Sequence, residues 1–289
     1  MKLLAKFNLI FLLVFLVGLG ASTLVARNLL EESAKQDVTD RARLLMEKAN
    51  AVANYTATQI KPLLETQMTY SFLPQSVPSY SAHEVLASLK KAYPDYSYKA
   101  AMLNPTNPRD RAVAWEEDVV GQFKNNAEMK EFIGERDTPA GRALYIARPI
   151  RISNPACLAC HDTPDNAPKT LVERYGPSNG FGWHLAETLG AQVVSVPMDV
   201  PLQQAHKALL LVVGLLTAVF VLIGAALNFM LWKLVIQPVS RLSGIADKVS
   251  LGEDAPEFQV KSRDEIGVLS ESFGRMRTSL ATAMKMLGE

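Results

Sequence analysis

Two long apolar stretches stand out in the pattern of hydrophobic and polar positions. Residues 7–26 and residues 208–232 contain no charged side chain, and each stretch is long enough to cross the hydrocarbon core of a bilayer as a helix. A helix satisfies its own backbone hydrogen bonds and tolerates a few uncharged polar side chains in lipid. Those inside the two stretches are Asn8, Ser22, Thr23, Thr217 and Asn228. The pattern predicts two transmembrane helices.

Basic residues outside these stretches predict their orientation. Lys2 and Lys6 precede the first, and Lys233, Arg241 and Lys248 follow the second, so both ends are expected in the cytoplasm and the segment between them outside. This arrangement predicts a bacterial inner-membrane protein with a periplasmic domain. The alternative for residues 7–26 is a cleaved signal peptide, but the apolar run is longer than the usual signal core. An uncleaved anchor is therefore the favoured interpretation.

The segment between the spans mixes two periodicities. Apolar residues three and four apart predict a long helix over residues 28–68, and shorter patterns predict helices at 83–93 and 115–126. Extended segments are expected at 96–103, 142–152 and 190–198, and two prolines with asparagines predict a turn at 104–108. These elements predict an α+β fold class for the domain between the spans.

A narrower apolar stripe follows the second span. Its steps of three and four are those of heptads, which a single helix buries only against partners. Pro238 and Gly252 frame the first helix, and the stripe consists of Leu242, Ile245 and Val249, then Ile266, Leu269, Phe273, Met276, Leu280, Ala283 and Leu287. The pattern predicts an all-α coiled coil of two helices per chain, completed to four helices in a homodimer.

Length and charge limit the classes of function. The chain has 289 residues, and the predicted domains are residues 1–27 (cytoplasmic stub and first span), 28–206 (periplasmic domain), 207–232 (second span) and 233–289 (cytoplasmic coil). A net charge of +1 gives no reason to expect a nucleic-acid partner. The sequence contains no catalytic triad, metal-hydrolase motif or phosphate loop, so the protein is not expected to be an enzyme.

The chain's two cysteines lie in the segment Cys157-Leu158-Ala159-Cys160-His161. Two residues between the thiols allow both sulfurs to bond one edge of a porphyrin as thioethers, and the adjoining histidine then ligates the iron. The motif therefore predicts covalent haem c, held by Cys157 and Cys160, with His161 as the proximal iron ligand. The expected location outside the cytoplasm agrees with this chemistry.

Three other interpretations of the two thiols remain. A disulfide across two residues is strained and more typical of redox-active sites. A thioredoxin-like pair does not require the histidine. A closed zinc site needs about four protein ligands, and the chain has no second cysteine pair. Covalent haem is the interpretation that uses all three residues.

The second axial ligand and the propionate partners are less defined by the sequence. A haem with one histidine ligand is either five-coordinate and open to a gas, or takes a second histidine, methionine, cysteine or tyrosine, and the chain has no third cysteine. Candidates outside the spans are His83, His184, His206, Met46, Met68, Met102, Met129 and Met198, of which Met46 on the long helix and His184 in a glycine-rich turn are preferred. Guanidinium groups suit propionates. Of Arg109, Arg111, Arg142, Arg148 and Arg151, Arg148 is singled out because its strand leads to the haem motif.

Several short motifs resemble a known family. They are Asn104-Pro-Thr-Asn-Pro-Arg109, Ala147-Arg148-Pro149, Cys157-Leu-Ala-Cys-His161, Ala167-Pro168, Tyr175-Gly176, Gly180-Phe-Gly-Trp183, Gly190-Ala-Gln192 and Val196-Pro197. Over residues 44–198 the chain resembles a c-type haem sensor domain, formerly a domain of unknown function, whose members are PAS-like. The resemblance implies a haem with His161 as proximal ligand and a second ligand from the N-terminal helix or a loop.

The C-terminal segment resembles a HAMP domain. Pro238 opens its first helix, Gly252 starts the connector, and Asp264-Glu265-Ile266-Gly267 starts its second helix. Val260 fits the second hydrophobic anchor of the connector. The first anchor departs from the pattern because Asp254 stands where leucine is usual, and Ala255 or Phe258 is expected to replace it.

Together these features predict a transmembrane signal-transduction sensor. Redox state or a small gaseous ligand at the haem would be relayed through HAMP to a cytoplasmic partner in trans, of kinase, cyclase or chemoreceptor type, because no such region follows residue 289. The alternative is a membrane-anchored monohaem c-type cytochrome that transfers electrons, for which a HAMP module has no use. A receptor without haem, for a small organic ligand, is the third possibility.

Overall fold

A computed structural model describes residues 3–251 and 264–287 of the chain. It divides into two compact units, one formed by Met1–Ala26 with Leu209–Glu289 and the other by Arg27–Ala208. The second unit contains the sheet and the cysteine motif. The domain boundaries expected from the sequence, which separate the spans from the coil, remain predictions.

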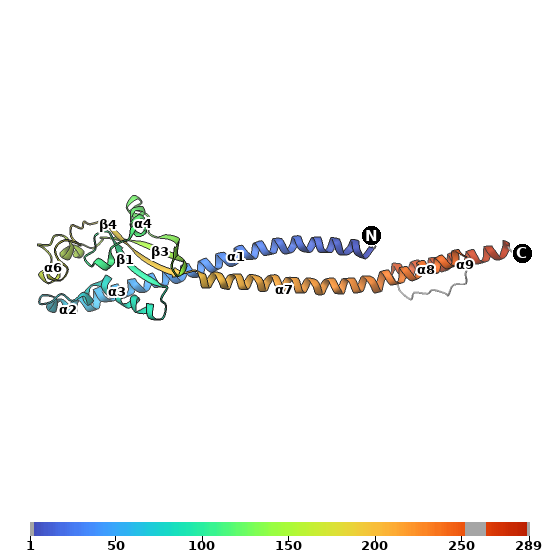
Figure 1. Ribbon diagram of the computed structural model, residues 1–289, viewed down its shortest axis with the longest axis horizontal. Coiled ribbons are helices and arrows are strands. Elements are labelled where there is room, and N and C mark those ends of the chain that lie inside the picture. The colour runs from blue at the N-terminus through green and yellow to red at the C-terminus, as the bar shows by residue number, and fades with distance from the viewer. Residues whose placement is uncertain (1–2, 252–263, 288–289) are drawn as a thin grey trace. The chain divides into compact units, whose positions relative to one another are not determined.

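A four-stranded antiparallel sheet forms the centre of Arg27–Ala208 (Figure 1). Its strands are β1 (Ser97–Met102), β2 (Phe132–Thr138), β3 (Gly141–Arg151) and β4 (Thr188–Pro197), in the order β1-β4-β3-β2. The two central strands, β3 and β4, are buried on both faces over most of their length, and their sequences are accordingly rich in apolar residues. The α+β fold class and three of the strands are as expected from the sequence.

Strand β2 was not expected. Exposed and half-buried positions alternate along it, and its sequence carries Glu135, Arg136 and Asp137. It lies at an edge of the sheet, where charged side chains protect the unpaired side. Its pairing with β3 is fixed by a tight turn at Gly141, whose φ of 108° is a conformation that favours glycine.

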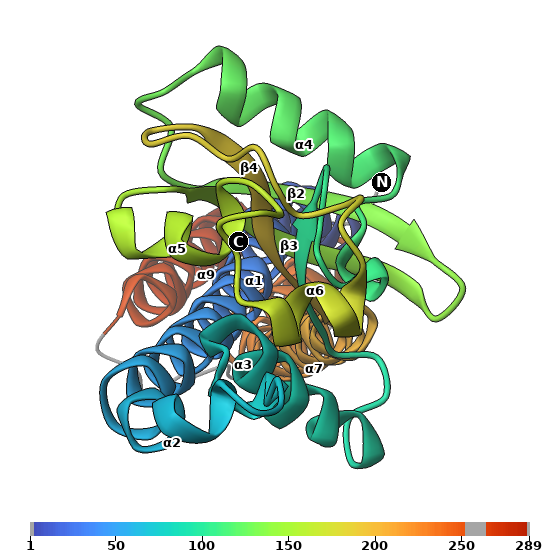
Figure 2. The same ribbon diagram turned by 90° about the vertical axis from the view of Figure 1, so that its left-hand side faces the viewer.

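Helices cover both faces of the sheet. One face is covered by α1 (Leu3–Tyr55), which buries Val38, Ala42 and Met46 against Leu144, Ile146, Val194 and Val196. The other face is covered by α4 (Ala114–Asn125), which buries Val119, Val120 and Phe123. Figure 2 shows α4 on one side of the sheet, and α1 with α3 (Pro78–Ser88) on the other. Two apolar cores therefore hold the sheet from both sides.

The long N-terminal helix changes its winding before it ends. A π-helical segment, Thr56–Ile60, separates α1 from α2 (Lys61–Met68), so the helical path runs through the expected end at Met68. Pro62 lies at the start of α2, where its missing N–H costs little. Single π turns within helices are frequent at functional sites, and this one lies one residue from Lys61.

The remaining elements are short, except for the long helices that follow β4. In Arg27–Ala208 they are the 3₁₀ turns η2 (Pro74–Ser76), η3 (Leu89–Lys91), η4 (Pro108–Asp110) and η5 (Pro155–Cys157), with α5 (Leu158–His161) and α6 (Lys169–Tyr175). The chain then continues directly from β4 into α7 (Asp199–Leu231), a π segment (Trp232–Ile236) and α8 (Gln237–Ser250); α9 spans Glu265–Leu287.

Two helices are long and apolar enough to cross a membrane. The most apolar windows of α1 and α7 have mean hydropathies of 2.6 and 2.8, and none of their residues is buried. Within this unit the two helices contact each other through stacked rings, with Phe220 3.5 Å from Phe15 and 4.4 Å from Phe11 between ring centroids. Asn8 and Asn228 exchange two amide hydrogen bonds of 2.9 and 2.8 Å. Two of the polar side chains within the apolar stretches therefore satisfy each other's hydrogen-bonding groups.

This amide pair is expected to couple the two helices energetically. In a double-mutant cycle of Asn8→Val and Asn228→Val, we expect a coupling free energy of about 0.6 kcal/mol, with an upper range of about 1.7 kcal/mol, as for other interhelical hydrogen bonds in membranes. The measurement is reversible unfolding of the full chain in mixed micelles. Thr217→Val is the control, because the Thr217 hydroxyl donates only within its own helix, to Val213. A coupling indistinguishable from zero would mean that the pair does not hold these helices together.

The C-terminal helices carry the predicted apolar stripe. Asp264 Oδ1 accepts hydrogen bonds from the backbone N–H groups of Ile266 and Gly267, both at 3.1 Å, and so caps α9. Leu242 of α8 is buried, whereas Leu269, Met276 and Leu280 of α9 are 45–61% exposed within the single chain. The expected connector residues Gly252, Asp254, Ala255, Phe258 and Val260 lie outside the described residues.

Candidate functional site

The cysteine motif forms a single helical turn. Asn154 Oδ1 accepts a hydrogen bond from Ala156 N at 2.9 Å and Pro155 follows as the first helical residue, which together start the turn. Cys157 is thus three residues before Cys160 and four before His161 within η5 and α5. Residues with these spacings lie on one face of a helix. Local sequence therefore presents both thiols and the imidazole in the same direction.

The hydrogen bonds of His161 define its tautomer. Its Nδ1 lies 2.7 Å from the carbonyl oxygen of Gly180, and a carbonyl only accepts hydrogen bonds, so Nδ1 carries the proton. Burial lowers the pKa of His161, and the Gly180 hydrogen bond offsets only part of that shift. The ring is therefore neutral at pH 7, with the lone pair on Nε2. This is the arrangement of a metal-ligating histidine whose other nitrogen is held by a backbone carbonyl.

The Gly180 carbonyl is placed by a close approach of two loops. Gly180 has φ +83°, and a Cβ there would lie 2.0 Å from Thr106 Oγ1 and 2.8 Å from Thr106 Cα. Asn104 Oδ1 accepts a hydrogen bond from Gly180 N at 3.3 Å, and Thr106 Oγ1 itself lies 3.4 Å from His161 Nδ1. Only glycine fits this position. The predicted turn at 104–108 thus supports the histidine.

Trp183 covers one face of the His161 ring. Its ring stacks on the His161 ring with centroids 3.7 Å apart and planes 10° from parallel. Its backbone N–H donates to the His161 carbonyl at 3.2 Å, and Gly182 N donates to the Asp162 carbonyl at 2.7 Å. Trp183 also packs with Ile152 and Leu189, against which Cys157 lies. The segment from Gly180 to Trp183 therefore holds both the side chain and the backbone of His161.

Both thiols are free and partly accessible in the structure. Burial raises the pKa of Cys160, Cys157 adds to that shift, and Lys61 of α2 opposes it. Cys160 is therefore a neutral thiol at pH 7.

The predicted second ligands differ in their surroundings. Met46 is fully buried between α1 and the sheet, in the cluster with Leu144, Ile146 and Val194. His184 is exposed and directly follows Trp183 in the chain. Of the other candidates, Met198 is buried, His206 is exposed, and His83, Met68, Met102 and Met129 are half-buried. The structure thus keeps His184 next to the motif in a loop and places Met46 in the core.

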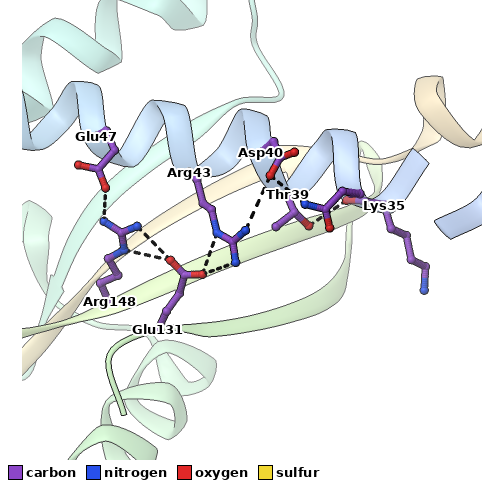
Figure 3. Close-up of polar contacts among 8 residues, drawn as sticks. Lys35, Thr39, Asp40, Arg43, Glu47, Glu131 and Arg148 are labelled. Carbon is purple, nitrogen blue, oxygen red and sulfur yellow. Dashed lines mark hydrogen bonds and ion pairs between the residues drawn. The ribbon is translucent and has the colours of Figure 1, made fainter. Parts of the chain in front are cut away.

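Arg148 belongs to a group of ion pairs between α1 and the sheet (Figure 3). Its guanidinium contacts Glu131 at 3.0 Å and Glu47 at 2.5 Å. Glu131 also pairs with Arg43 of α1 at 2.9 Å. Arg148 therefore joins α1 to β3 in the structure, and its role as a propionate partner remains a prediction.

Because of Glu131, the free energy of unfolding is expected to fall at acidic pH. Partial burial favours its neutral form, but the hydrogen bonds from Arg43 and Arg148 outweigh this and lower its pKa below the usual 4.5. Because the folded-state pKa is depressed, the stabilisation is present above about pH 4.5 and is lost as pH falls through the folded-state value. Glu131→Gln should remove it, lowering the free energy of unfolding near pH 7 by on the order of 1 kcal/mol for a partly exposed network.

Denaturant unfolding of the full chain at several pH values measures this dependence. Glu131→Gln should flatten the acid side of the stability curve. Glu128→Gln is the matched control, since Glu128 is exposed and precedes the same strand. Equal curves for the two variants would contradict the assigned role of the network.

Three residues that hold His161 were not singled out as site residues from the sequence. Thr106, Gly180 and Trp183 all lie in motifs that carry the family resemblance, yet no spacing rule connects them to the histidine. The feature of the sequence that could have indicated their role is the occurrence of glycines and a tryptophan close together in Gly180-Phe-Gly-Trp183. Their function depends on the path of the chain between residues 104 and 183.

The fold and the site define the class of protein. It has an α+β domain in which a neutral histidine with a free Nε2 lies close in sequence to two thiols. In the sequence, this domain stands between two long apolar helices, and the helices α8 and α9 follow it. The model of the Tll0287-like family, described as Tll0287, matches residues 31–197, and that of the HAMP domain matches residues 230–282. Since the first match covers more than half of the chain, the protein belongs to the Tll0287-like family. The expected order of a sensor domain of this family followed by a HAMP domain is confirmed.

Two individual proteins are also similar. The methyl-accepting chemotaxis protein TlpA of Bacillus subtilis (strain 168) is 26% identical over 106 residues, which are 37% of this chain and 15% of that protein. The chain thus spans a small part of this relative. The crystal structure of the cyanobacterial heme-protein Tll0287 is 19% identical, with a TM-score of 0.41 over 56% of this chain and 93% of that chain.

Proposed function

We propose that the protein is a transmembrane sensor that binds haem c through Cys157 and Cys160, with His161 as proximal iron ligand, and relays the state of the haem through HAMP. The hydrogen bond from His161 Nδ1 to the Gly180 carbonyl supports this most directly, because it leaves Nε2 as the nitrogen available to iron. Membership of the Tll0287-like family together with a HAMP domain favours signalling over catalysis.

The residues fit a covalent haem. Cys157, Cys160 and His161 lie on one helical face, both sulfurs are free thiols, and the imidazole is neutral. Each thiol would add across one vinyl group, forming a carbon–sulfur bond and placing the thiol proton on the neighbouring carbon, so nothing leaves. When bound, the iron supplies one-electron redox chemistry or a site for a gas. The protein would hold His161 Nε2 toward the metal through Gly180 and Trp183.

The route out of the sensor domain would follow β4. This strand starts five residues after Trp183, pairs with both β1 and β3, and ends at Pro197, next to α7 at Asp199. A haem-dependent difference in how His161 is held would bias the position of β4, and a ligand shifts an equilibrium only through such a difference. With two spans and the predicted charge bias, we place this domain in the periplasm of a bacterial inner-membrane protein.

The HAMP helices would form the output as a homodimer. Leu269, Met276 and Leu280 form an apolar stripe that is largely exposed in one chain, and such a stripe is buried in a coiled coil. A second copy would supply the two further helices. We propose a cytoplasmic signalling partner of kinase, cyclase or chemoreceptor type.

The test measures HAMP packing against haem state in the same molecules. Met276→Cys places a thiol on the predicted seam, and its disulfide formation rate between copies should change at least severalfold between the oxidised and reduced haem. Thr278→Cys, two residues later on the outer face, is the matched control and should cross-link slowly in both states. If the disulfide formation rate at residue 276 is the same after haem reduction or gas addition, in protein shown to carry haem, the sensor function is refuted.

A further inference from the structure

Trp183 is buried although the polar group of its side chain makes no hydrogen bond to the described residues. The residue is 9% exposed, and its indole Nε1–H has no hydrogen-bond acceptor among residues 3–251 and 264–287. Buried tryptophans usually find an acceptor for this group, because an unmade hydrogen bond is costly. The indole is therefore not held in place by its N–H. Its position must be explained by what its ring contacts.

The ring contacts the imidazole of the proposed iron ligand. The two rings are 3.7 Å apart at their centroids and lie within 10° of parallel. The Gly180 carbonyl and Thr106 Oγ1 both contact the imidazole at Nδ1, so these polar contacts act on one atom and limit turning of the ring about its Cβ–Cγ bond only at that edge. A flat ring stacked on one face blocks this turning. The two contacts together define the direction of Nε2.

We propose that Trp183 is a positioning residue for the haem iron: by stacking on His161 it fixes the rotational orientation of the imidazole ligand and thereby the redox potential of the iron. This inference rests on the proposed ligation of iron by His161. Orientation and hydrogen bonding of an axial ligand are among the means by which a protein tunes haem iron. The stack also shields His161 from solvent on that face.

The rest of the segment supports a rigid stack. Gly182 N and Trp183 N donate to the carbonyls of Asp162 and His161, so the two backbones are joined beside the two rings. Gly180 and Gly182 both have positive φ, +83° and +77°, which lets the loop return over the histidine. The indole also packs against Ile152, which follows β3, and Leu189 of β4. The imidazole is therefore stacked on a fixed ring.

The experiment compares Trp183→Phe and Trp183→Leu in the full chain, purified in detergent after maturation with haem. Phenylalanine keeps an aromatic face and loses only an N–H that has no acceptor among the described residues. The midpoint potential of the Phe variant should therefore stay within about 18 mV of that of the unmodified protein. This corresponds to a twofold change in the oxidised-to-reduced ratio, since a tenfold change is about 59 mV for a one-electron couple. Leucine removes the stack. We expect at least a tenfold change, about 59 mV, together with a broadened set of ferric EPR signals.

Trp115→Leu is the matched control. Trp115 lies in the same unit, edge-on to Tyr145 with centroids 5.1 Å apart, and is far in the sequence from the motif. It should leave the potential and the EPR signals unchanged. Equal potentials for the Leu and Phe variants of Trp183 would overturn the proposal, as would equal shifts in the Leu variants of Trp183 and Trp115.

Two further results keep the test decisive. If Trp183→Leu fails to fold, the unmodified protein still tests the inference, since a fixed imidazole gives one set of haem methyl resonances in the ferric NMR spectrum and a turning one gives several. Several sets would overturn it. Absence of haem from the unmodified protein would instead refute the proposed function.

Discussion

Replacing Cys157 and Cys160 with alanine is expected to abolish covalent haem in the full chain. They are the chain's two cysteines, and each supplies one proposed thioether, so the double variant keeps no carbon–sulfur bond to the porphyrin. Each single variant should retain one bond and a reduced amount of haem. The measurement is intact mass, with haem-dependent peroxidase staining after denaturation, on protein matured in a host that attaches haem c.

The control for this prediction is His184→Ala. His184 is exposed and adjoins the site, but it takes no part in the attachment, so this variant should carry the full amount of haem. Its visible spectrum separately tests His184 as the second axial ligand. Haem bound to the unmodified protein but released by denaturation would contradict covalent attachment while leaving haem binding intact. Both thiols unmodified and no haem would favour a receptor of another kind.

Met46→Ala is expected to lower the free energy of unfolding by about 2–5 kcal/mol, the cost of truncating a buried methionine. The side chain is fully buried where α1 crosses β3 and β4, among Leu144, Ile146 and Val194. Met46→Leu conserves volume and should cost less than about 1.5 kcal/mol. Because the surroundings of the sulfur are aliphatic side chains, we also expect the ferrous visible spectrum of Met46→Leu to match that of the unmodified protein.

Met198→Leu is the matched control, since Met198 is equally buried in the same cluster. Denaturant unfolding in detergent gives the free energies, and visible spectra of the same samples report the iron. A change from low-spin to high-spin iron in Met46→Leu, absent from Met198→Leu, would establish Met46 as the second axial ligand. A loss below about 1 kcal/mol in Met46→Ala would contradict its place in the core.

Local features of the sequence were sufficient to predict the parts of the protein that depend on neighbouring residues. The two apolar helices follow from charge-free runs over residues 7–26 and 208–232. The turn at 104–108 was expected from its prolines, and Asn107 indeed accepts a hydrogen bond from Arg109 N at 3.2 Å. Helix α4 and strands β1, β3 and β4 lie within two residues of their expected ends. In each case the determining residues are adjacent.

Features that depend on contacts between distant segments were not predictable. Strand β2 was missed because an edge strand needs no continuous apolar pattern. The position of Arg148 before the motif predicts a propionate partner, whereas its charged neighbours Glu47 and Glu131 come from α1 and the segment before β2. The residue type of Met46 predicts a possible ligand, and only the tertiary structure shows that this side chain packs against Leu144, Ile146 and Val194; its role as second axial ligand stays a prediction.

The sequence by itself determined two apolar segments long enough to cross a membrane, a thiol–thiol–histidine motif and two heptad stripes, because each depends only on residues near one another in the chain. The tertiary structure decided how the histidine is held. Gly180, 19 residues after His161, and Thr106, 55 residues before it, meet its Nδ1, and Trp183 covers its ring. Hydrogen bonds and ring stacking act over a few ångströms, so they depend on which loops the folded sheet brings together, and no periodicity in the sequence records that.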